Sequence, residues 1–153
     1  MIITNNKTNF SKIIHDRLST SWLFLVSCLL LHVIDEAVNN FLDLYNPIVL
    51  KIKASIPFLP LPTFTFKIWI VGLSFLIIIL FFLTTLVYNR NKLIISLIKI
   101  FSILMIFNGL GHIFGSIYYS KIIAGMVSSP FLIIASICVI YFSRFKNKNL
   151  PEH

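Results

Sequence analysis

The fold is decided by residues 21–41, which read SWLFLVSCLLLHVIDEAVNNF. A helix needs about 20 mainly apolar residues to cross the hydrocarbon core of a bilayer, and this stretch is long enough to do so. Its apolar run also contains one histidine and two acids, at His32, Asp35 and Glu36. We therefore expect a membrane-spanning helix that carries ionisable side chains inside the membrane.

The whole chain has the same apolar character. Of its 153 residues, 58% are hydrophobic and 12% are charged, and the mean hydropathy is +0.92. This composition excludes a soluble globular domain. It also excludes intrinsic disorder, which requires low hydrophobicity, because the chain contains 15 Phe and 5 Tyr. The sequence therefore predicts an integral membrane protein.

Four stretches are long and apolar enough to be spanning helices, at about 21–41, 67–88, 93–118 and 122–142. Tight links at 88–92 and 119–121 make sequential helices antiparallel neighbours. The predicted fold class is all-α: a single domain, 1–153, forming a four-helix transmembrane bundle in up-down-up-down order. The longest connection, 43–66, contains prolines that disfavour a regular helix through it, and its middle, 48–53, is expected to lie along the membrane interface.

The net charge of +8 is concentrated in short segments between the apolar runs. Three Lys and Arg residues in the amino-terminal segment, two in the 88–92 link and three in the carboxyl-terminal tail lie on one side of the predicted bundle, against four on the other. This asymmetry predicts a multi-pass protein of the cell membrane with cytoplasmic tails at 1–20 and 143–153. The expected partners are membrane lipids rather than nucleic acid, and a homo-oligomer is left open.

The ionisable residues of the first span form a pattern that suggests a site. His32, Asp35 and Glu36 are spaced i, i+3, i+4, so they share one face of a helix. The third span carries Asn108 and His112, also i, i+4, at a similar predicted depth. An ionisable residue inside the membrane costs about 3 kcal/mol on insertion scales, so these groups need partners. We expect His32, Glu36, Asn108 and His112 to converge in the outer half of the bundle.

Three glycines surround the polar residues of the third span: Gly109, Gly111 and Gly115. Glycine lets a neighbouring helix approach closely, and Gly111 with Gly115 forms a small-xxx-small pair. This pattern predicts close helix packing beside the polar cluster.

The motif His32-x-x-Asp35-Glu36, followed two spans later by Asn108-x-x-x-His112, resembles the HXXEE family of small membrane proteins. The resemblance covers the chain from the first to the fourth span. Asp35 replaces the usual Glu, and the Tyr-x-Pro-Gly-like turn before the last span lacks its proline, since Tyr119 is followed later by Ala124 and Gly125. The family is functionally uncharacterised, so the resemblance supports the site and implies no reaction.

The preferred interpretation of the cluster is a divalent metal site. Two imidazoles and a carboxylate form the ligand set that zinc uses in hydrolases and iron in oxygenases. The direct ligands are predicted to be His32, Glu36 and His112, with Asp35 as a fourth ligand or proton carrier and Asn108 orienting a ligand. Zinc is preferred over iron because no redox feature is visible. Glu36 and Asp35 are the predicted catalytic residues, acting on a lipid-like substrate.

Three alternatives are kept beside the metal site. The first is a metal-free pocket that binds a lipid or sterol-like molecule, or transfers protons on it as an isomerase does. The second is an ion or proton pathway. The third is a purely structural polar lock between two helices, in which each hydrogen bond contributes about 1 kcal/mol.

Overall fold

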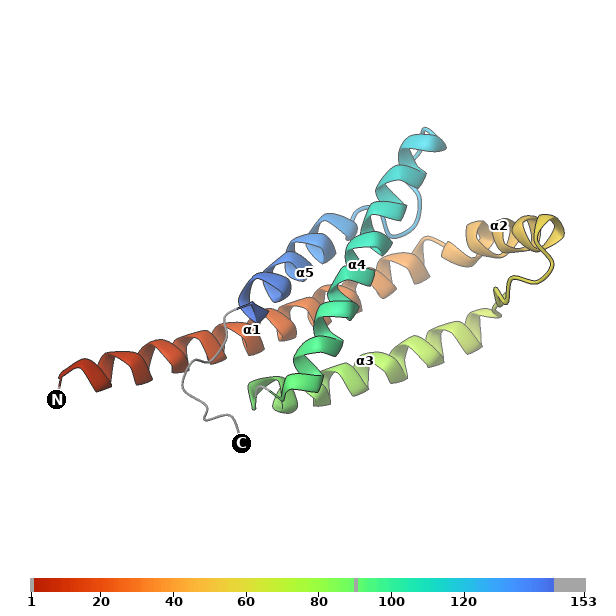
Figure 1. Ribbon diagram of the computed structural model, residues 1–153. Helices are drawn as coiled ribbons and strands as arrows, with labels where there is room; N and C mark the ends of the chain where they lie inside the picture. Colours follow the sequence, from red (N-terminus) through yellow and green to blue (C-terminus); the bar gives the residue numbers. More distant parts are fainter. Residues whose placement is uncertain (1, 90, 145–153) are drawn as a thin grey trace.

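The computed structural model describes residues 2–89 and 91–144, so the predicted tail at 143–153 lies outside the described residues from position 145 onward. Within the described part all regular secondary structure is α-helical, without strands (Figure 1). Its helices are α1 (Ile2–Val38), α2 (Phe41–Ser55), α3 (Phe66–Tyr88), α4 (Lys92–Tyr118) and α5 (Ser129–Ser143).

Three segments are long and apolar enough to cross a membrane: Arg17–Val38 within α1, Phe66–Tyr88 and Lys92–Tyr118. As helices long and apolar enough to span, the segments predicted at 67–88 and 93–118 are found almost to the residue. The first span ends earlier than expected because residues 39 and 40 form a turn, in which Asn40 adopts a left-handed conformation with φ 54°. Its helix also begins well before the predicted start and continues back to Ile2.

The fourth predicted span, 122–142, is only partly helical. Its helix, α5, begins at Ser129 and has 15 residues, fewer than the ~20 that a crossing requires. Residues 119–128, here called the 119–128 loop, form turns instead of the expected tight link. Gly125 takes φ 80° within this loop, and Pro130 lies in the first turn of α5, where its missing N–H costs nothing.

The long connection after the first span is more regular than predicted. It contains α2, with Pro47 inside the helix, whereas the remaining prolines fall in the irregular segment 56–65. A proline removes one backbone hydrogen bond, and tertiary contacts offset that loss. The Asn46 side chain donates to the Phe64 carbonyl at 2.9 Å and accepts from the Phe64 N–H at 3.0 Å, so α2 is fastened to the segment that leads into α3.

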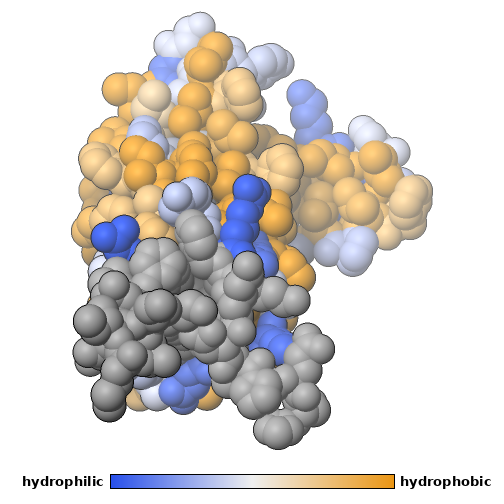
Figure 2. Space-filling model, turned by 60° about the vertical axis from the view of Figure 1, so that its left-hand side comes forward, coloured by the Kyte–Doolittle hydropathy of each residue, from blue (hydrophilic) through white to orange (hydrophobic). Residues whose placement is uncertain are grey.

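Helix α1 lies at the centre of the packing. It packs against α3 on one side and α5 on the other, while α4 packs mainly on α5 (Figure 1). Trp22 of α1 is fully buried in this core, and its indole N–H donates to the Leu80 carbonyl of α3 at 3.1 Å. Apolar side chains also cover much of the outer surface (Figure 2), as expected for helices that face lipid.

Close approach beside the polar cluster occurs at Gly109 and Gly115. A Cβ atom at Gly109 would lie 2.8 Å from the Ile133 side chain and 3.2 Å from the Ser129 carbonyl of α5. One at Gly115 would lie 2.8 Å from Ile123. Gly111 has nothing within 4 Å, so the predicted Gly111–Gly115 pair does not form a packing surface.

Candidate metal centre

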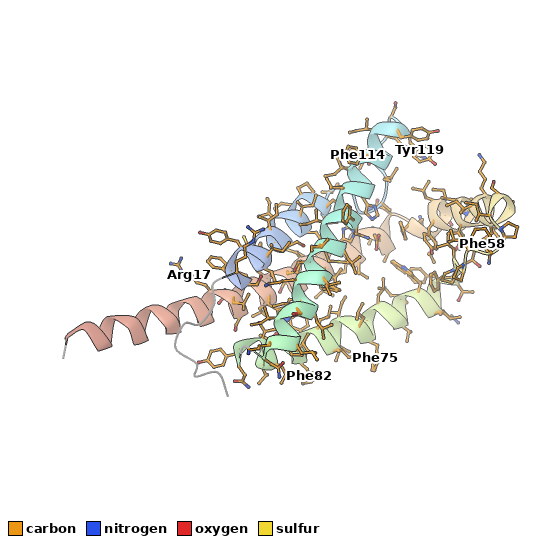
Figure 3. All side chains as sticks on the ribbon, in the orientation of Figure 1. Arg17, Phe58, Phe75, Phe82, Phe114 and Tyr119 are labelled. Atoms are coloured by element: carbon orange, nitrogen blue, oxygen red, sulfur yellow. The ribbon has the colours of Figure 1, made fainter. Side chains whose placement is uncertain are left out.

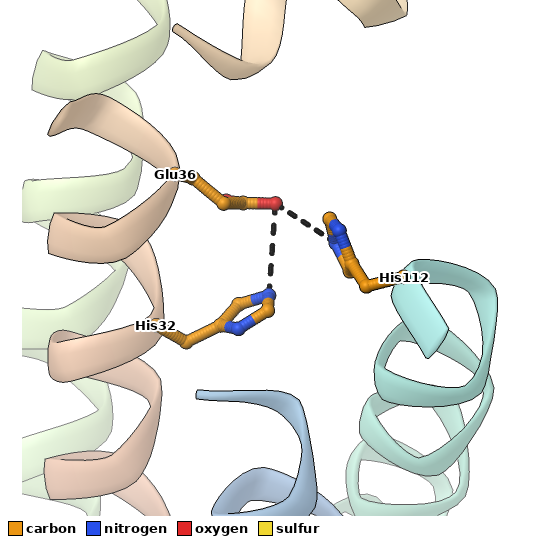
Figure 4. A group of neighbouring side chains, drawn as sticks. All are labelled: His32, Glu36 and His112. Carbon is orange, nitrogen blue, oxygen red and sulfur yellow. Dashed lines mark ion pairs between the residues drawn. The ribbon is translucent and has the colours of Figure 1, made fainter. Parts of the chain in front are cut away.

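The structure brings His32 and Glu36 of α1 together with His112 of α4 (Figure 4). The Glu36 Oε1 atom lies 3.6 Å from His32 Nε2 and 3.0 Å from His112 Nε2. The exposed fractions are 1% for His32, 5% for Glu36 and 6% for His112, so the group is closed to solvent. One ligand atom from each residue lies within 4.8 Å of the others, and the group could therefore hold a metal ion.

Helix geometry explains the convergence. His32 and Glu36 are one turn apart on α1, so their side chains project from the same face. His32 lies as far before Val38, the end of α1, as His112 lies before Tyr118, the end of α4. At the usual helical rise each distance is about 9 Å, and Glu36 Oε1 contacts the Nε2 atoms of both histidines.

The other ring nitrogen of His112 determines where its proton lies. His112 Nδ1 is 2.6 Å from the Ala124 carbonyl oxygen. A carbonyl can only accept, so Nδ1 must carry the hydrogen and donate it. In a neutral His112 ring the Nε2 atom is then unprotonated, and its lone pair is directed at Glu36.

Ser128, which is hydrogen-bonded to both Asp35 and His32, fixes His32 in the same tautomer. The Ser128 hydroxyl donates to Asp35 Oδ2 at 2.7 Å and therefore accepts from His32 Nδ1 at 2.8 Å. Because a serine hydroxyl has a single proton, the hydrogen of this second bond must belong to His32 Nδ1. The Nε2 atom of a neutral His32 is left as a lone pair, and it has no hydrogen-bond partner among the described residues.

Three electron-rich atoms therefore face one another in a buried space. Two imidazole lone pairs and a carboxylate repel unless a cation or a proton lies between them. Ligands about 2.0–2.2 Å from a tetrahedral zinc ion are about 3.3 Å apart, and the distances of 3.0 and 3.6 Å to Glu36 lie on either side of that value. Metal-binding histidines usually donate the N–H of their other ring nitrogen to a nearby acceptor, as both histidines do here through Nδ1.

Asp35 does not join the three ligand residues. Its Oδ2 atom accepts from the Ser128 hydroxyl and from the Ser128 N–H at 3.1 Å, and its Oδ1 atom accepts from Asn39 at 2.8 Å. Both carboxylate oxygens are thus engaged elsewhere, so the geometry does not favour Asp35 as a fourth ligand. Asp35 is linked to His32 through the Ser128 hydroxyl.

Asn108 lies one turn before His112 on α4 and is exposed. Its amide is close enough to His32 to interact with that side chain, but it is not part of the three-residue group. The orienting role assigned to Asn108 from the sequence stays a prediction.

The 119–128 loop supplies the contacts that the sequence did not reveal. It places Ala124 and Ser128 on the two histidines, and Gly125 lies directly against both rings. A Cβ atom at Gly125 would be 2.7 Å from His112 Nδ1 and 2.9 Å from His32 Cε1. With φ 80° in addition, this position accepts only glycine without strain. The sequence feature that could have indicated this loop is the run from Gly125 to Pro130, because a turn-forming glycine followed by a proline typical of the first helical turn marks a break before a helix.

A cavity of about 270 Å³ adjoins the centre at Glu36. We call it the aromatic cavity because its lining includes the rings of Phe41, Phe64, Phe66 and Trp69. It lies where α1 ends, α2 begins and α3 begins, and Asp43 of α2 also lines it. The Phe41 ring is 5.5 Å from the His112 ring, centroid to centroid, so the cavity wall reaches the histidines.

Comparisons of the chain with protein-family models, with curated proteins and with solved structures found no match. The functional argument therefore depends on the geometry of this site.

Proposed function

We propose that the chain is a multi-pass protein of the cell membrane, of the HXXEE type, with both termini cytoplasmic and lipids as its partners. Three helices that can span a membrane supply three crossings. Two contacts at opposite ends of α5 support a fourth crossing by the 119–128 loop and α5 together. Ser128 bonds Asp35 at one end, and the Arg17 guanidinium lies 6.0 Å from the centroid of the Phe142 ring at the other. From Arg17 to Asp35 a helix rises about 27 Å, close to the bilayer core thickness.

The centre of His32, Glu36 and His112 is proposed to bind zinc. The observation that carries this proposal is that Ala124 and Ser128 hold both imidazoles as Nδ1–H tautomers. Each Nε2 lone pair is thereby directed at the Glu36 carboxylate in a buried space. Two imidazoles and one carboxylate leave the fourth position of a tetrahedral ion open, which is the pattern of catalytic rather than structural zinc sites.

The proposed activity is hydrolysis of a lipid. Zinc in such a site supplies a Lewis acid that makes water nucleophilic near neutral pH. The protein's own contribution is to orient both imidazoles, to exclude bulk water and to keep Glu36 beside the reacting position. The aromatic cavity meets the centre at Glu36. It lies at the C-terminal end of α1 and the N-terminal end of α3, and the ends of spanning helices lie at the level of the lipid head groups.

Elemental analysis of the purified protein tests the metal. We expect near-stoichiometric zinc in the wild type and its loss in His32→Ala and in His112→Ala. Ser102→Ala is the matched control, since Ser102 is buried on α4 and its hydroxyl donates to the carbonyl of Ile98, one turn earlier on the same helix. If the purified wild type contains no metal but still binds lipid, the metal-free proton-transfer pocket becomes the supported interpretation in place of the zinc site. Lipid hydrolysis by zinc-loaded protein, absent in His112→Ala, tests the reaction.

A further inference from the structure

The aromatic cavity has walls suited to an organic cation. The Trp69 ring lies 6.1 Å from the Phe41 ring and 6.0 Å from the Phe66 ring, centroid to centroid, so Trp69 neighbours two of the other three lining rings. The face of an aromatic ring is negative and attracts a cation placed over it. Quaternary ammonium groups are recognised in this way because they shed water easily.

The charges of the lining point the same way. Asp43 is exposed and forms no ion pair with any described residue, so its charge is available to a ligand. Lys121, which shares a neighbouring cavity with Asp43, is not paired with it. None of the described residues that line the aromatic cavity is basic. The Asn46 amide is engaged by Phe64 through both its nitrogen and its oxygen. The polar lining that faces a ligand is therefore the Asp43 and Glu36 carboxylates and the Asn40 amide.

Size and position identify the part of the ligand that fits. Pockets for whole small ligands measure about 300–1,000 Å³, and this cavity of about 270 Å³ is slightly smaller. It is large enough for a head group and too small for acyl chains. It also lies where α1 ends at Val38 and α3 begins at Phe66, the level at which spanning helices meet lipid head groups.

We propose that the aromatic cavity binds an alkylammonium group, held by the Asp43 carboxylate and the rings of Phe41, Phe66 and Trp69. The inference rests on the proposed function in one respect, since the bound group would belong to the lipid presented to the metal centre. Glu36 lines the cavity and belongs to the centre, so a head group bound there places the adjoining part of the lipid beside the ligands.

Tryptophan fluorescence tests the proposal, because Trp69 lines the cavity and Trp22, the other tryptophan of the chain, is buried in the core. Purified protein in dodecyl maltoside is titrated with dodecyltrimethylammonium, with dodecyl sulfate as the anion of equal chain length, and with free tetramethylammonium. We expect a saturable change with the first probe and none with dodecyl sulfate. If dodecyltrimethylammonium binds more tightly than tetramethylammonium, the site is assigned to a lipid head group. If the two bind equally well, it is assigned to a soluble ammonium compound.

Variants show whether the cavity is the binding site. Asp43→Asn and Phe66→Leu should each raise the half-saturating concentration about tenfold. Ser55→Lys adds the same unit of charge to α2 outside the cavity, and Phe58→Leu removes a ring that is 85% exposed nearby (Figure 3). Both controls should bind as the wild type does. An equal response to dodecyl sulfate, or no effect of Asp43→Asn, would overturn the proposal.

The same titration on His112→Ala separates this inference from the zinc site. Binding retained in this metal-free variant supports the ammonium site independently of zinc. A wild type that contains zinc but shows no response to the ammonium probe refutes this inference and leaves the zinc site intact.

Discussion

Glu36 of α1 and His112 of α4 lie 3.0 Å apart, oxygen to nitrogen, although their helices have little direct packing between them. Helix α5 packs on both α1 and α4, and the 119–128 loop that precedes it touches both histidines. Besides the edge-on contact of the Trp22 and Phe101 rings, the polar centre and the loop beside it therefore join α1 to α4. This arrangement makes the centre sensitive to substitutions in the loop as well as to those of its ligands.

Glu36→Gln should separate metal binding from folding. A Gln amide can donate one hydrogen to each of the two Nε2 lone pairs, so it satisfies both histidines without a cation. We expect zinc affinity to fall more than about 100-fold while the melting temperature stays close to that of the metal-free wild type. Elemental analysis and thermal unfolding measure the two effects. Undiminished zinc in this variant would exclude Glu36 as a ligand.

Gly125→Ala should disrupt the centre from outside its ligand set. The added methyl group would overlap both imidazole rings, and alanine is strained at φ 80°. Strain of this kind costs about 1–3 kcal/mol, so we expect a lower melting temperature and loss of zinc. Gly111→Ala is the matched control, because nothing lies within 4 Å of a Cβ there. It should unfold at the same temperature as the wild type or a higher one. Equal behaviour of the two variants would contradict the placement of the loop.

Ser128→Ala should weaken the metal site without removing a ligand. It breaks the relay from Asp35 to His32 and frees the His32 ring to rotate or change tautomer. Loss of such an orienting partner lowers metal affinity about 10–100-fold. Competition with a chelator of known affinity measures the change. Ser136→Ala serves as the control, since the Ser136 hydroxyl donates to the Leu132 carbonyl within α5. If both variants bind zinc equally well, the hydrogen bonds through Ser128 have no role.

Membrane topology can be tested by cysteine labelling in cells. In a variant lacking Cys28 and Cys138, a cysteine at Asn89 should react only from the cytoplasm. One at Lys53 should react only from outside, because α3 separates the two positions. Membrane-impermeant maleimide measures both. The reverse pattern would invert the proposed orientation, and labelling of both positions from one side would show that α3 does not cross.

The sequence alone determined α3 and α4, two helices long and apolar enough to span a membrane, and the placement of His32 and Glu36 on one face of α1. Hydropathy over about 20 residues specifies a crossing, because every residue in the hydrocarbon core faces the same apolar solvent. The i, i+4 spacing on α1 specifies which side chains share a face, because the helix repeat is fixed. The meeting with His112 was also predicted, from depths that follow from the same helical rise.

Only the tertiary structure decided the form of residues 119–143 and the surroundings of the His32, Glu36 and His112 group. Residues 122–128 are apolar enough to be read as helix, yet they form turns. Non-helical backbone at membrane depth is tolerated where it is buried in protein, and here the Ala124 and Gly125 carbonyls accept from His112 and Ser129. The bond from His112 to Ala124 joins residues twelve positions apart, on a helix and in a loop, and local periodicity contains no information about it. For the same reason the sequence could not show that Asp35 turns to Ser128, or that Asn108 stays exposed outside the ligand group.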